Sequence, residues 1–592
     1  MKYLFIGIVA ITFISCKLSN SNQTREDNKE LNAFFDKYYE DRLKLFPLEA
    51  TAIGDKRYNN LLPLDFTDSY RDTLKEFFNR YRIYVTKYDR DALNENDKIS
   101  YDIFKREMEI SIEGLNFHEN YIPFQQFWGL PLSMGQLGSG TGNQPFKTVK
   151  DYDDWLSRAA LFSVWADSSI AYFRKGIAAN YVLPGVLVVK MIPQMEAMQT
   201  TDATKSLYYG PVQKFPDGIN DADKKRLTTA FAGLINEQLV PSYKKLGDFL
   251  KNEYLPKART TSGINALPKG DSLYRYYIRY WTTTDKKADE IYNTGLSEVK
   301  RILTVMDSVK NAVGFKGDLK EFFQYMKTQK QFMPYKTPQN VLNAFHNIHK
   351  TMQPNLNKMF GRTPKTPFEI RQTEAFRAAS ASAEYNQGSP DGSRPGIFYV
   401  PVLDATTFNT TSGMESLFLH EAIPGHHYQI SLQQENESLP KFRRFVFYSA
   451  YGEGWALYCE SLGKELGLYT DPYQYIGALG DEMHRAIRLV VDVAIHTKGW
   501  TREQAIKFMM ENEAISEQGA TAEIERYMAI PAQALSYKIG AIKIRELRDK
   551  YSRELGSNFK LSAFHDEFLK DGCMPLDVLE RKMDDWAKKQ KK

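Results

Sequence analysis

Three of the nine histidines of the chain lie within one run of eight residues, and a glutamate, Glu421, directly follows the first of them, His420. In zinc peptidases a His-Glu pair on an apolar helix begins the metal site, with a second histidine four residues after the first and the glutamate acting on water. Here that fourth position is Pro424, which has no ligating atom. A zinc site in this chain therefore needs a different local geometry.

Two geometries could supply the second histidine ligand. On a regular helix, residue i+7 lies only about 20° from the starting direction, so His427 could face the metal together with His420. Pro424 disfavours that helix because it lacks an N–H and clashes with the carbonyl four residues back. Alternatively, Pro424 and Gly425 are two residues inserted into the motif, and His426 is the second ligand. We favour His426 and keep His427 open; the remaining histidine would orient a ligand or meet the substrate.

The segment 451–460 supplies two candidates for the third protein ligand that a zinc site needs. Glu453 lies 33 residues after His420, far enough for a second helix to pack alongside the first, and the glycines on both sides of it allow a close approach. We assign Glu453 as the ligand. Glu460 is seven residues further on, so on one helix it faces the same way as Glu453. We expect Glu460 to hold a ligand histidine in place without binding the metal itself.

Most of the chain is expected to be helical, with apolar residues at helical spacing and breaks at Gly and Pro clusters. Residues 129–145 and 385–395 are expected to be loops. Residues 396–403 form the clearest strand, and Pro401 suggests an edge position. The prediction is a mainly α protein: one large helical body over residues 31–592, with a small antiparallel sheet, or two lobes around a groove. The expected helices span residues 31–45, 152–179, 221–250, 286–313, 338–350, 501–516 and 562–569.

At the residues of the candidate site the chain resembles a known family. The segments 420–427 and 452–456, together with blocks spread over nearly the whole mature chain, are similar to the bacterial "domain of unknown function 885" family. That family is placed with the zincin-like metallopeptidases. The resemblance implies a large helical metallopeptidase body of the gluzincin type with a deep substrate groove, and it gives fold and site better than substrate.

The resemblance also suggests supporting residues. In gluzincins an edge strand upstream of the His-Glu helix binds extended substrate, and the strand at 396–403, which carries Tyr399, is suitably placed. Tyr527, Tyr537 and His496 are candidate donors to a developing oxyanion. Arg526, with Arg485 and Arg488, could pair with a peptide carboxylate, although surface ion pairs are the simpler explanation for Arg485.

The N-terminus has the features of a secretory signal. Lys2 precedes a short apolar run, and Cys16 follows a small residue in a sequence that resembles a bacterial lipobox. We expect residues 1–15 to be a lipoprotein signal peptide, Cys16 to be lipidated, and residues 16–30 to form a flexible tether to a membrane. The localisation expected is the cell envelope, facing the periplasm or the exterior. Cys459 and Cys573 lie in segments that read as separate helices, so no disulfide is expected.

Composition excludes several classes. The chain of 592 residues has a net charge of only +5 and 26% charged residues, so a nucleic-acid partner and a mainly disordered state are not expected. With three cysteines it is not a disulfide scaffold. The function expected is a peptidase with one Zn²⁺ that hydrolyses short or unfolded peptides, with Glu421 as general base. The alternatives are an inactive lipoprotein that binds peptides or envelope components, and hydrolysis of another amide.

Overall fold

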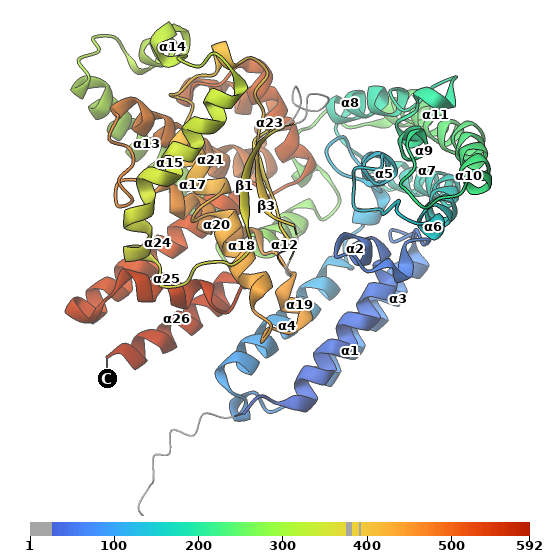
Figure 1. Ribbon diagram of the computed structural model, residues 1–592, viewed down its shortest axis with the longest axis horizontal. Coiled ribbons are helices and arrows are strands. Elements are labelled where there is room, and N and C mark those ends of the chain that lie inside the picture. The colour runs from blue at the N-terminus through green and yellow to red at the C-terminus, as the bar shows by residue number, and fades with distance from the viewer. Residues whose placement is uncertain (1–25, 374–381, 390–391, 393, 592) are drawn as a thin grey trace, which may run out of the picture.

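The computed structural model describes residues 26–373, 382–389, 392 and 394–591, so the signal segment and Cys16 lie outside the described residues. Helices dominate, and Figure 1 shows them in three groups. The first group lies at the bottom of the view and contains α1 (Lys29–Leu45), α2 (Pro47–Ala52), α3 (Asp68–Val85) and α4 (Glu95–Gly114). Because Asn28 caps α1 through its side chain, the helix begins two residues before the expected position.

The second group lies to the right in Figure 1. It contains α5 (Leu130–Gly138), α6 (Val149–Ala160), α7 (Phe162–Ala178), α8 (Gly185–Glu196), α9 (Gly210–Gln213), α10 (Asp221–Leu234) and α11 (Val240–Phe249). The expected loop at 129–145 is wrong in part, since α5 occupies its first half. Pro131 near the helix start and buried Met134 favour this helix despite the surrounding glycines.

The third group surrounds the sheet on the left of Figure 1. It contains α12 (Gly270–Thr282), α13 (Ala288–Ala312), α14 (Leu319–Thr328), α15 (Pro338–Met359), α17 (Met414–Glu421), α18 (His426–Glu435), α19 (Lys441–Arg444), α20 (Ser449–Glu460), α21 (Pro472–Thr497), α22 (Arg502–Asn512), α23 (Glu517–Ala529), α24 (Leu535–Leu555), α25 (Leu561–Leu569) and α26 (Leu576–Gln590). The mainly α prediction is confirmed. Helix α15 continues past its expected end because Met352, Leu356 and Met359 extend its buried face.

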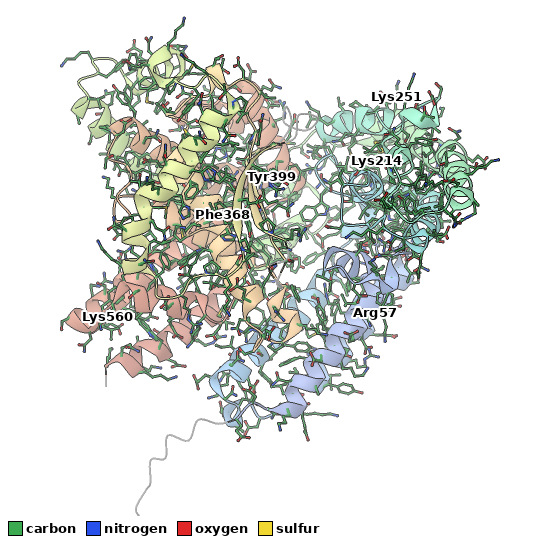
Figure 2. The ribbon with its side chains drawn as sticks, in the orientation of Figure 1. Arg57, Lys214, Lys251, Phe368, Tyr399 and Lys560 are labelled. Carbon is green, nitrogen blue, oxygen red and sulfur yellow. The ribbon has the colours of Figure 1, made fainter. Side chains whose placement is uncertain are left out.

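The sheet has three strands, β1 (Phe368–Gln372), β2 (Glu384–Asn386) and β3 (Gly396–Val400), in the order β1-β3-β2. β3 pairs with β1 in parallel and with β2 in antiparallel orientation, so the prediction of an antiparallel sheet is wrong for one of the two pairs. The edge position predicted for the strand at 396–403 is also wrong, because β3 ends at Val400, before Pro401, and is the central strand. Figure 2 labels Phe368 on β1 and Tyr399 on β3 near the centre of the molecule.

Buried apolar side chains connect the groups of helices. Trp155 and Tyr243 from the second group belong to the same cluster as Ile487 and Val491 of α21 in the third. A second cluster joins the sheet to α15, α17, α18, α20 and α24. Burial of this much apolar surface is the main stabilising term of the fold. Among the helices of the described ranges, none is long and apolar enough to cross a membrane.

Candidate metal centre

Two short helices bring the first two histidines together. His420 is the last residue but one of α17, and His426 is the first residue of α18. Between the two helices, residues 422–425 form a turn that is not helical. A Cβ built on Gly425 would lie 1.9 Å from the carbonyl oxygen of His420, so only glycine allows the second helix to start so close to the end of the first.

The turn between the two helices is held from α20. The indole Nε1 of Trp455 donates to the carbonyl oxygen of Pro424 at 2.8 Å, and Trp455 is fully buried. Helix α20 is itself pressed against α24, because a Cβ on Gly454 would lie 2.6 Å from the Cα of Gly540. The glycine after Glu453 thus serves the packing of α20 on α24, whereas we expected it to allow the approach to His420.

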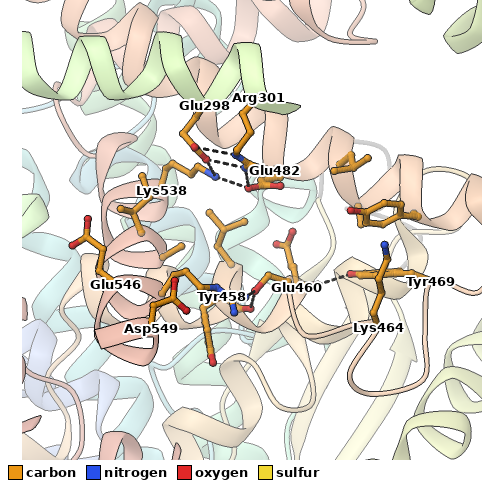
Figure 3. Close-up of a pocket in the computed structure, with 18 residues that line it drawn as sticks. Glu298, Arg301, Tyr458, Glu460, Lys464, Tyr469, Glu482, Lys538, Glu546 and Asp549 are labelled. Atoms are coloured by element: carbon orange, nitrogen blue, oxygen red, sulfur yellow. Dashed lines mark hydrogen bonds and ion pairs between the residues drawn. The ribbon is translucent and has the colours of Figure 1, made fainter. Parts of the chain in front are cut away.

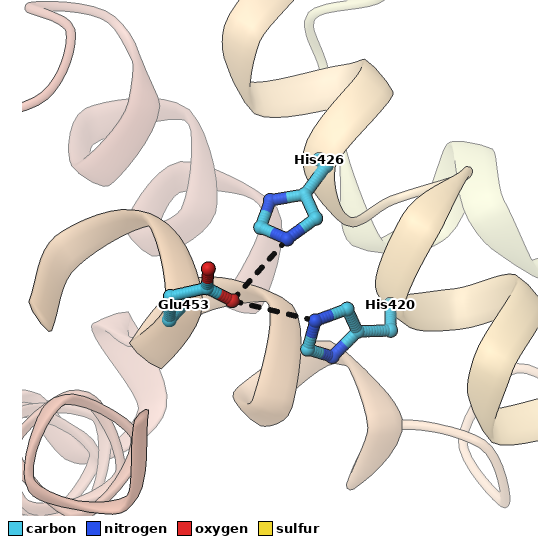
Figure 4. Close-up of side chains that lie close together, drawn as sticks. All are labelled: His420, His426 and Glu453. Atoms are coloured by element: carbon cyan, nitrogen blue, oxygen red, sulfur yellow. Dashed lines mark ion pairs between the residues drawn. The ribbon is translucent and has the colours of Figure 1, made fainter. Parts of the chain in front are cut away.

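The side chains of His420, His426 and Glu453 converge, as Figure 4 shows. Glu453 Oε2 lies 3.5 Å from His420 Nε2 and 3.4 Å from His426 Nε2. One ligand atom from each residue lies within 4.8 Å of the other two, and in the part of the chain that the structure describes no other group of His, Cys, Asp or Glu does so. Of the two alternatives left open by the sequence, the structure therefore places His426 in the cluster.

The donor set suits zinc. Bond lengths of about 2.0–2.1 Å in a tetrahedral site separate adjacent ligand atoms by about 3.3 Å, close to the two nitrogen–oxygen distances of the cluster. Two imidazoles and one carboxylate are also the protein ligands of a class of catalytic zinc sites that leaves one position open. The side chains of His426 and Glu453 retain 11% and 16% exposure, so the cluster is not sealed.

Glu460 holds His420 from the side opposite Glu453. Its Oε1 lies 2.7 Å from His420 Nδ1, so the ring donates through Nδ1 and directs its Nε2 to the cluster. Burial alone would lower the pKa of His420, but the bonds to Glu453 and Glu460 raise it to about 10. Burial would raise the pKa of Glu453, and the two histidines hold it well below its usual range instead. The carboxylates of Glu453 and Glu460 thus stabilise positive charge at His420.

Glu421 adjoins the cluster and is fixed by the sheet. Its Oε2 accepts a hydrogen bond of 3.0 Å from the backbone N–H of Tyr385 in β2. Burial raises the pKa of Glu421, while the nearby charges of His420 and His426 lower it. A carboxylate in this position, held by one backbone donor, is suited to accept and return a proton.

His427 lies outside the cluster and packs against the sheet. Its Nδ1 is 3.0 Å from the hydroxyl of Tyr385, and its ring lies 4.9 Å from that of Phe368. Burial lowers the pKa of His427 to about 4, so the ring is neutral at physiological pH. Its position is that of a residue that fixes α18 to the strands.

Arg526 and Tyr527 belong to a separate polar network on α21 and α23. The Tyr527 hydroxyl donates to Glu523 and accepts from Arg488 Nε at 3.0 Å. Arg526 lies 3.6 Å from Glu523 and donates to Gln533. The hydroxyl of Tyr527 is therefore engaged by neighbouring side chains, and no hydrogen bond or ion pair in the described ranges joins this network directly to His420, His426 or Glu453.

The other sequence-predicted residues lie as follows. The Tyr537 ring stacks under the Arg488 guanidinium at 4.6 Å. His496 is fully buried; its Nδ1 accepts from the backbone of Ile264 and its Nε2 faces the carbonyl of Tyr527. Because the backbone occupies both ring nitrogens, His496 is a packing residue, and its predicted role as a donor to substrate is corrected. Tyr399 lies on the central strand, whose backbone is already paired on both sides, so strand addition at β3 is excluded.

Two residues near the cluster escaped the sequence analysis. Tyr385 supplies both the N–H for Glu421 and the hydroxyl for His427, although it stands at the start of a segment expected to be a loop. Phe447 is 48% exposed and its ring lies 6.4 Å from that of His426. An exposed Phe beside a candidate ligand offers an apolar surface to whatever approaches it. No local sequence signal distinguishes either residue.

Comparisons with known proteins identify the family and the fold of the chain. A family model described as "Bacterial protein of unknown function (DUF885)" matches residues 47–583. No curated protein matches the chain. The crystal structure of a candidate lipoprotein from Colwellia psychrerythraea is 28% identical with a TM-score of 0.87, and the match covers 95% of this chain and 99% of that one. A candidate lipoprotein of unknown function from Shewanella oneidensis is 20% identical with a TM-score of 0.74, over 93% and 99%, which shows a shared fold.

Proposed function

The chain belongs to the bacterial family of proteins of unknown function DUF885, and we propose that it is a zinc-dependent peptidase acting on short or unfolded peptides. The observation that carries the proposal is the convergence of His420, His426 and Glu453, with Glu421 adjoining them. A zincin-like body of the gluzincin type, with a substrate groove that excludes folded proteins, is part of the same proposal.

The residues divide the chemistry among themselves. His420, His426 and Glu453 would hold Zn²⁺, which when bound supplies a Lewis acid for the scissile carbonyl and makes water more acidic. Glu421 accepts the proton of the attacking water at its carboxylate and returns it to the leaving amine. The backbone of Tyr385 orients that carboxylate, and Glu460 orients the ring of His420.

A binding lipoprotein without activity is the alternative, and the same site could also act on an amide other than a peptide bond. A binding role would be favoured if the inserted Pro424 and Gly425 disrupted the zinc motif. The turn at residues 422–425 leaves both imidazoles beside Glu453, which supports the catalytic role over binding alone. The carboxylate of Glu421 also favours catalysis, because binding alone has no use for a general base.

The test is turnover of a peptide library by the zinc-loaded, full-length protein in detergent. Glu421→Gln keeps the size of the side chain and removes its basicity, so we expect the rate to fall by at least about 10²-fold. Glu437→Gln, at an exposed glutamate after α18, is the matched control and should leave the rate unchanged. Absence of cleavage by the parent, with zinc bound and an active control peptidase, would leave the binding alternative.

We also propose that Cys16 is lipidated and anchors the protein to a membrane of the cell envelope. The lipobox-like sequence before Cys16 supports this, and the two structural relatives are described as candidate lipoproteins. In cells the parent should sediment with membranes and carry a diacylglyceryl mass on its N-terminal peptide. Cys16→Ala should lose that mass; an unmodified N-terminus in the parent would contradict the proposal.

A further inference from the structure

A cavity lies next to the candidate metal centre. It has a volume of about 480 Å³ and is enclosed by α13, α20, α21 and α24. Figure 3 shows its lining, with Glu460 in the middle of the view, Lys464 to its right, and Glu546 and Asp549 to its left. The volume is in the range of small-molecule sites. Because Glu460 also bonds His420, the cavity and the metal centre share a residue.

The two carboxylate oxygens of Glu460 have different surroundings. Oε1 bonds His420, whereas Oε2 is buried and has no hydrogen-bond partner among the described residues. The residue is only 5% exposed. In Figure 3 its carboxylate projects from α20 towards the ion pairs on the far wall. A buried carboxylate oxygen without a hydrogen-bond donor costs free energy. A ligand that supplies a donor at this oxygen would remove that cost.

Four other charged side chains of the cavity, of which Lys538 is buried, pair with one another. Lys538 Nζ lies 2.8 Å from Glu298 and 2.6 Å from Glu482. Arg301 pairs with the same two glutamates. These four side chains form a closed, neutral network that does not include Glu460. Glu460 pairs with His420 through Oε1, and among the described residues that line the cavity its Oε2 is the buried side-chain polar atom that lacks a hydrogen-bond partner.

Two cations line the cavity without a carboxylate. Lys464 Nζ lies 3.9 Å from the centre of the Tyr475 ring, and the Arg545 guanidinium lies 5.0 Å from that of Tyr458. Within the described ranges no ion pair joins either cation to a carboxylate, although Arg545 donates to the hydroxyl of Ser461. Aromatic rings hold cations in place while leaving their charge available to an anion.

We propose that this cavity binds a small zwitterion, a free amino acid or a dipeptide, and that this binding changes the zinc affinity of the metal centre. The ammonium group donates to Glu460 Oε2, and the carboxylate pairs with Lys464 or Arg545. Tyr469 and Leu479 supply apolar surface for the side chain. Because Glu460 positions His420, a bound ligand and zinc must change each other's affinity by the same factor. Binding of the zwitterion stands by itself, and the coupling rests on the proposed metal centre.

The first experiment is calorimetric titration of the metal-free, full-length protein in detergent with leucine and with glycyl-leucine. We expect at least one of the two to bind. N-acetylleucine lacks the ammonium and leucine amide lacks the carboxylate, so each should bind at least tenfold more weakly than leucine. Failure of both zwitterions to bind would overturn the proposal, as would equal binding of N-acetylleucine.

Variants test whether the cavity itself binds the ligand. Lys464→Ala combined with Arg545→Ala should weaken zwitterion binding at least tenfold. Lys251→Ala is the matched control, an exposed lysine on the second group of helices that Figure 2 shows on the right, and it should bind leucine like the parent. Thermal unfolding of each variant verifies the fold. Unchanged binding in the double variant would place the ligand outside the cavity and overturn the proposal.

Zinc titration in the presence of saturating leucine tests the coupling. The zinc Kd of the parent should change at least threefold, and that of the Lys464→Ala, Arg545→Ala double variant should not change. An unchanged Kd in the parent would overturn the coupling and leave the binding site. A protein that binds leucine but neither zinc nor peptide would overturn the proposed function and not the cavity.

Discussion

At the scale of single residues, two adjacent histidines have different surroundings. His426 faces Glu453 across 3.4 Å at the start of α18, and its neighbour His427 turns to the sheet and bonds Tyr385. Successive residues of a helix differ by about 100° in direction, so only one of the two can face the cluster. Because the two rings point in different directions, substitution of His426 and substitution of His427 should have different effects on zinc binding.

We expect His426→Ala to lose zinc while His427→Ala retains it. His427→Ala removes a buried partner of the Tyr385 hydroxyl and should lower the free energy of unfolding by about 1–3 kcal/mol. Elemental analysis of the dialysed proteins, with urea unfolding of the same samples, measures both effects. Loss of zinc in His427→Ala, with retention in His426→Ala, would reverse the assignment.

At the scale of elements, the turn at residues 422–425 decides whether α17 and α18 can present two ligands together. Gly425 permits the close approach of the two helices, and Trp455 on α20 holds the carbonyl of Pro424. The same helix, α20, carries Glu453, so one element both supplies the third ligand and fixes the turn between the other two. The backbone at Gly425 is thus a point at which a single methyl group should disrupt the site.

Gly425→Ala is expected to weaken zinc binding by about tenfold or more. The added Cβ would overlap the His420 carbonyl, and overpacking of this kind costs about 1–3 kcal/mol. Gly480→Ala is the control, since that glycine lies in α21 with nothing within 4 Å of the added Cβ and alanine favours a helix. Competitive titration with a zinc chelator dye gives both affinities. Equal zinc affinity in Gly425→Ala and the parent would show that the turn is not critical.

The features of the site that have a local sequence signal could be predicted from the sequence. Ligand residue types, the inserted Pro424-Gly425 and the spacing of Glu453 and Glu460 were enough to indicate His420, Glu453 and Glu460, and they favoured His426 while leaving His427 open. The order of the strands was not predictable, because parallel pairing of β1 with β3 joins segments far apart and adds no local pattern. The contact of Tyr385 with Glu421 spans 36 residues and depends on the pairing of β2 with β3. For the same reason the edge-strand prediction for β3 failed.

At the scale of the whole molecule, buried neutral histidines connect stability to pH. His565 is fully buried, with Nδ1 2.9 Å from the Met359 carbonyl and Nε2 2.9 Å from the Tyr458 hydroxyl. Burial lowers the pKa of His565 from the ordinary histidine value of 6.5 to about 3. Between these values the unfolded chain binds a proton that the folded protein does not, so the free energy of unfolding falls as pH falls through this window.

The contribution of His565 should be about 1.4 kcal/mol per pH unit between pH 6 and pH 4. His565→Gln removes the titrating group, so its free energy of unfolding should depend less steeply on pH than that of the parent by about this amount. Denaturant unfolding at several pH values, with chelator present to remove the effect of metal, measures the slopes. His118→Gln, at an exposed histidine, should keep the parent slope; a parent slope in His565→Gln would contradict the account.

The central claim is that His420, His426 and Glu453 hold one zinc ion. The measurement that tests it most directly is zinc stoichiometry by elemental analysis of the full-length protein and of Glu453→Ala, after incubation with zinc and extensive dialysis. We predict about one zinc per chain in the parent and a loss of that zinc in Glu453→Ala, with Glu437→Ala equal to the parent. No zinc in the parent, or the same amount in Glu453→Ala, would contradict the claim.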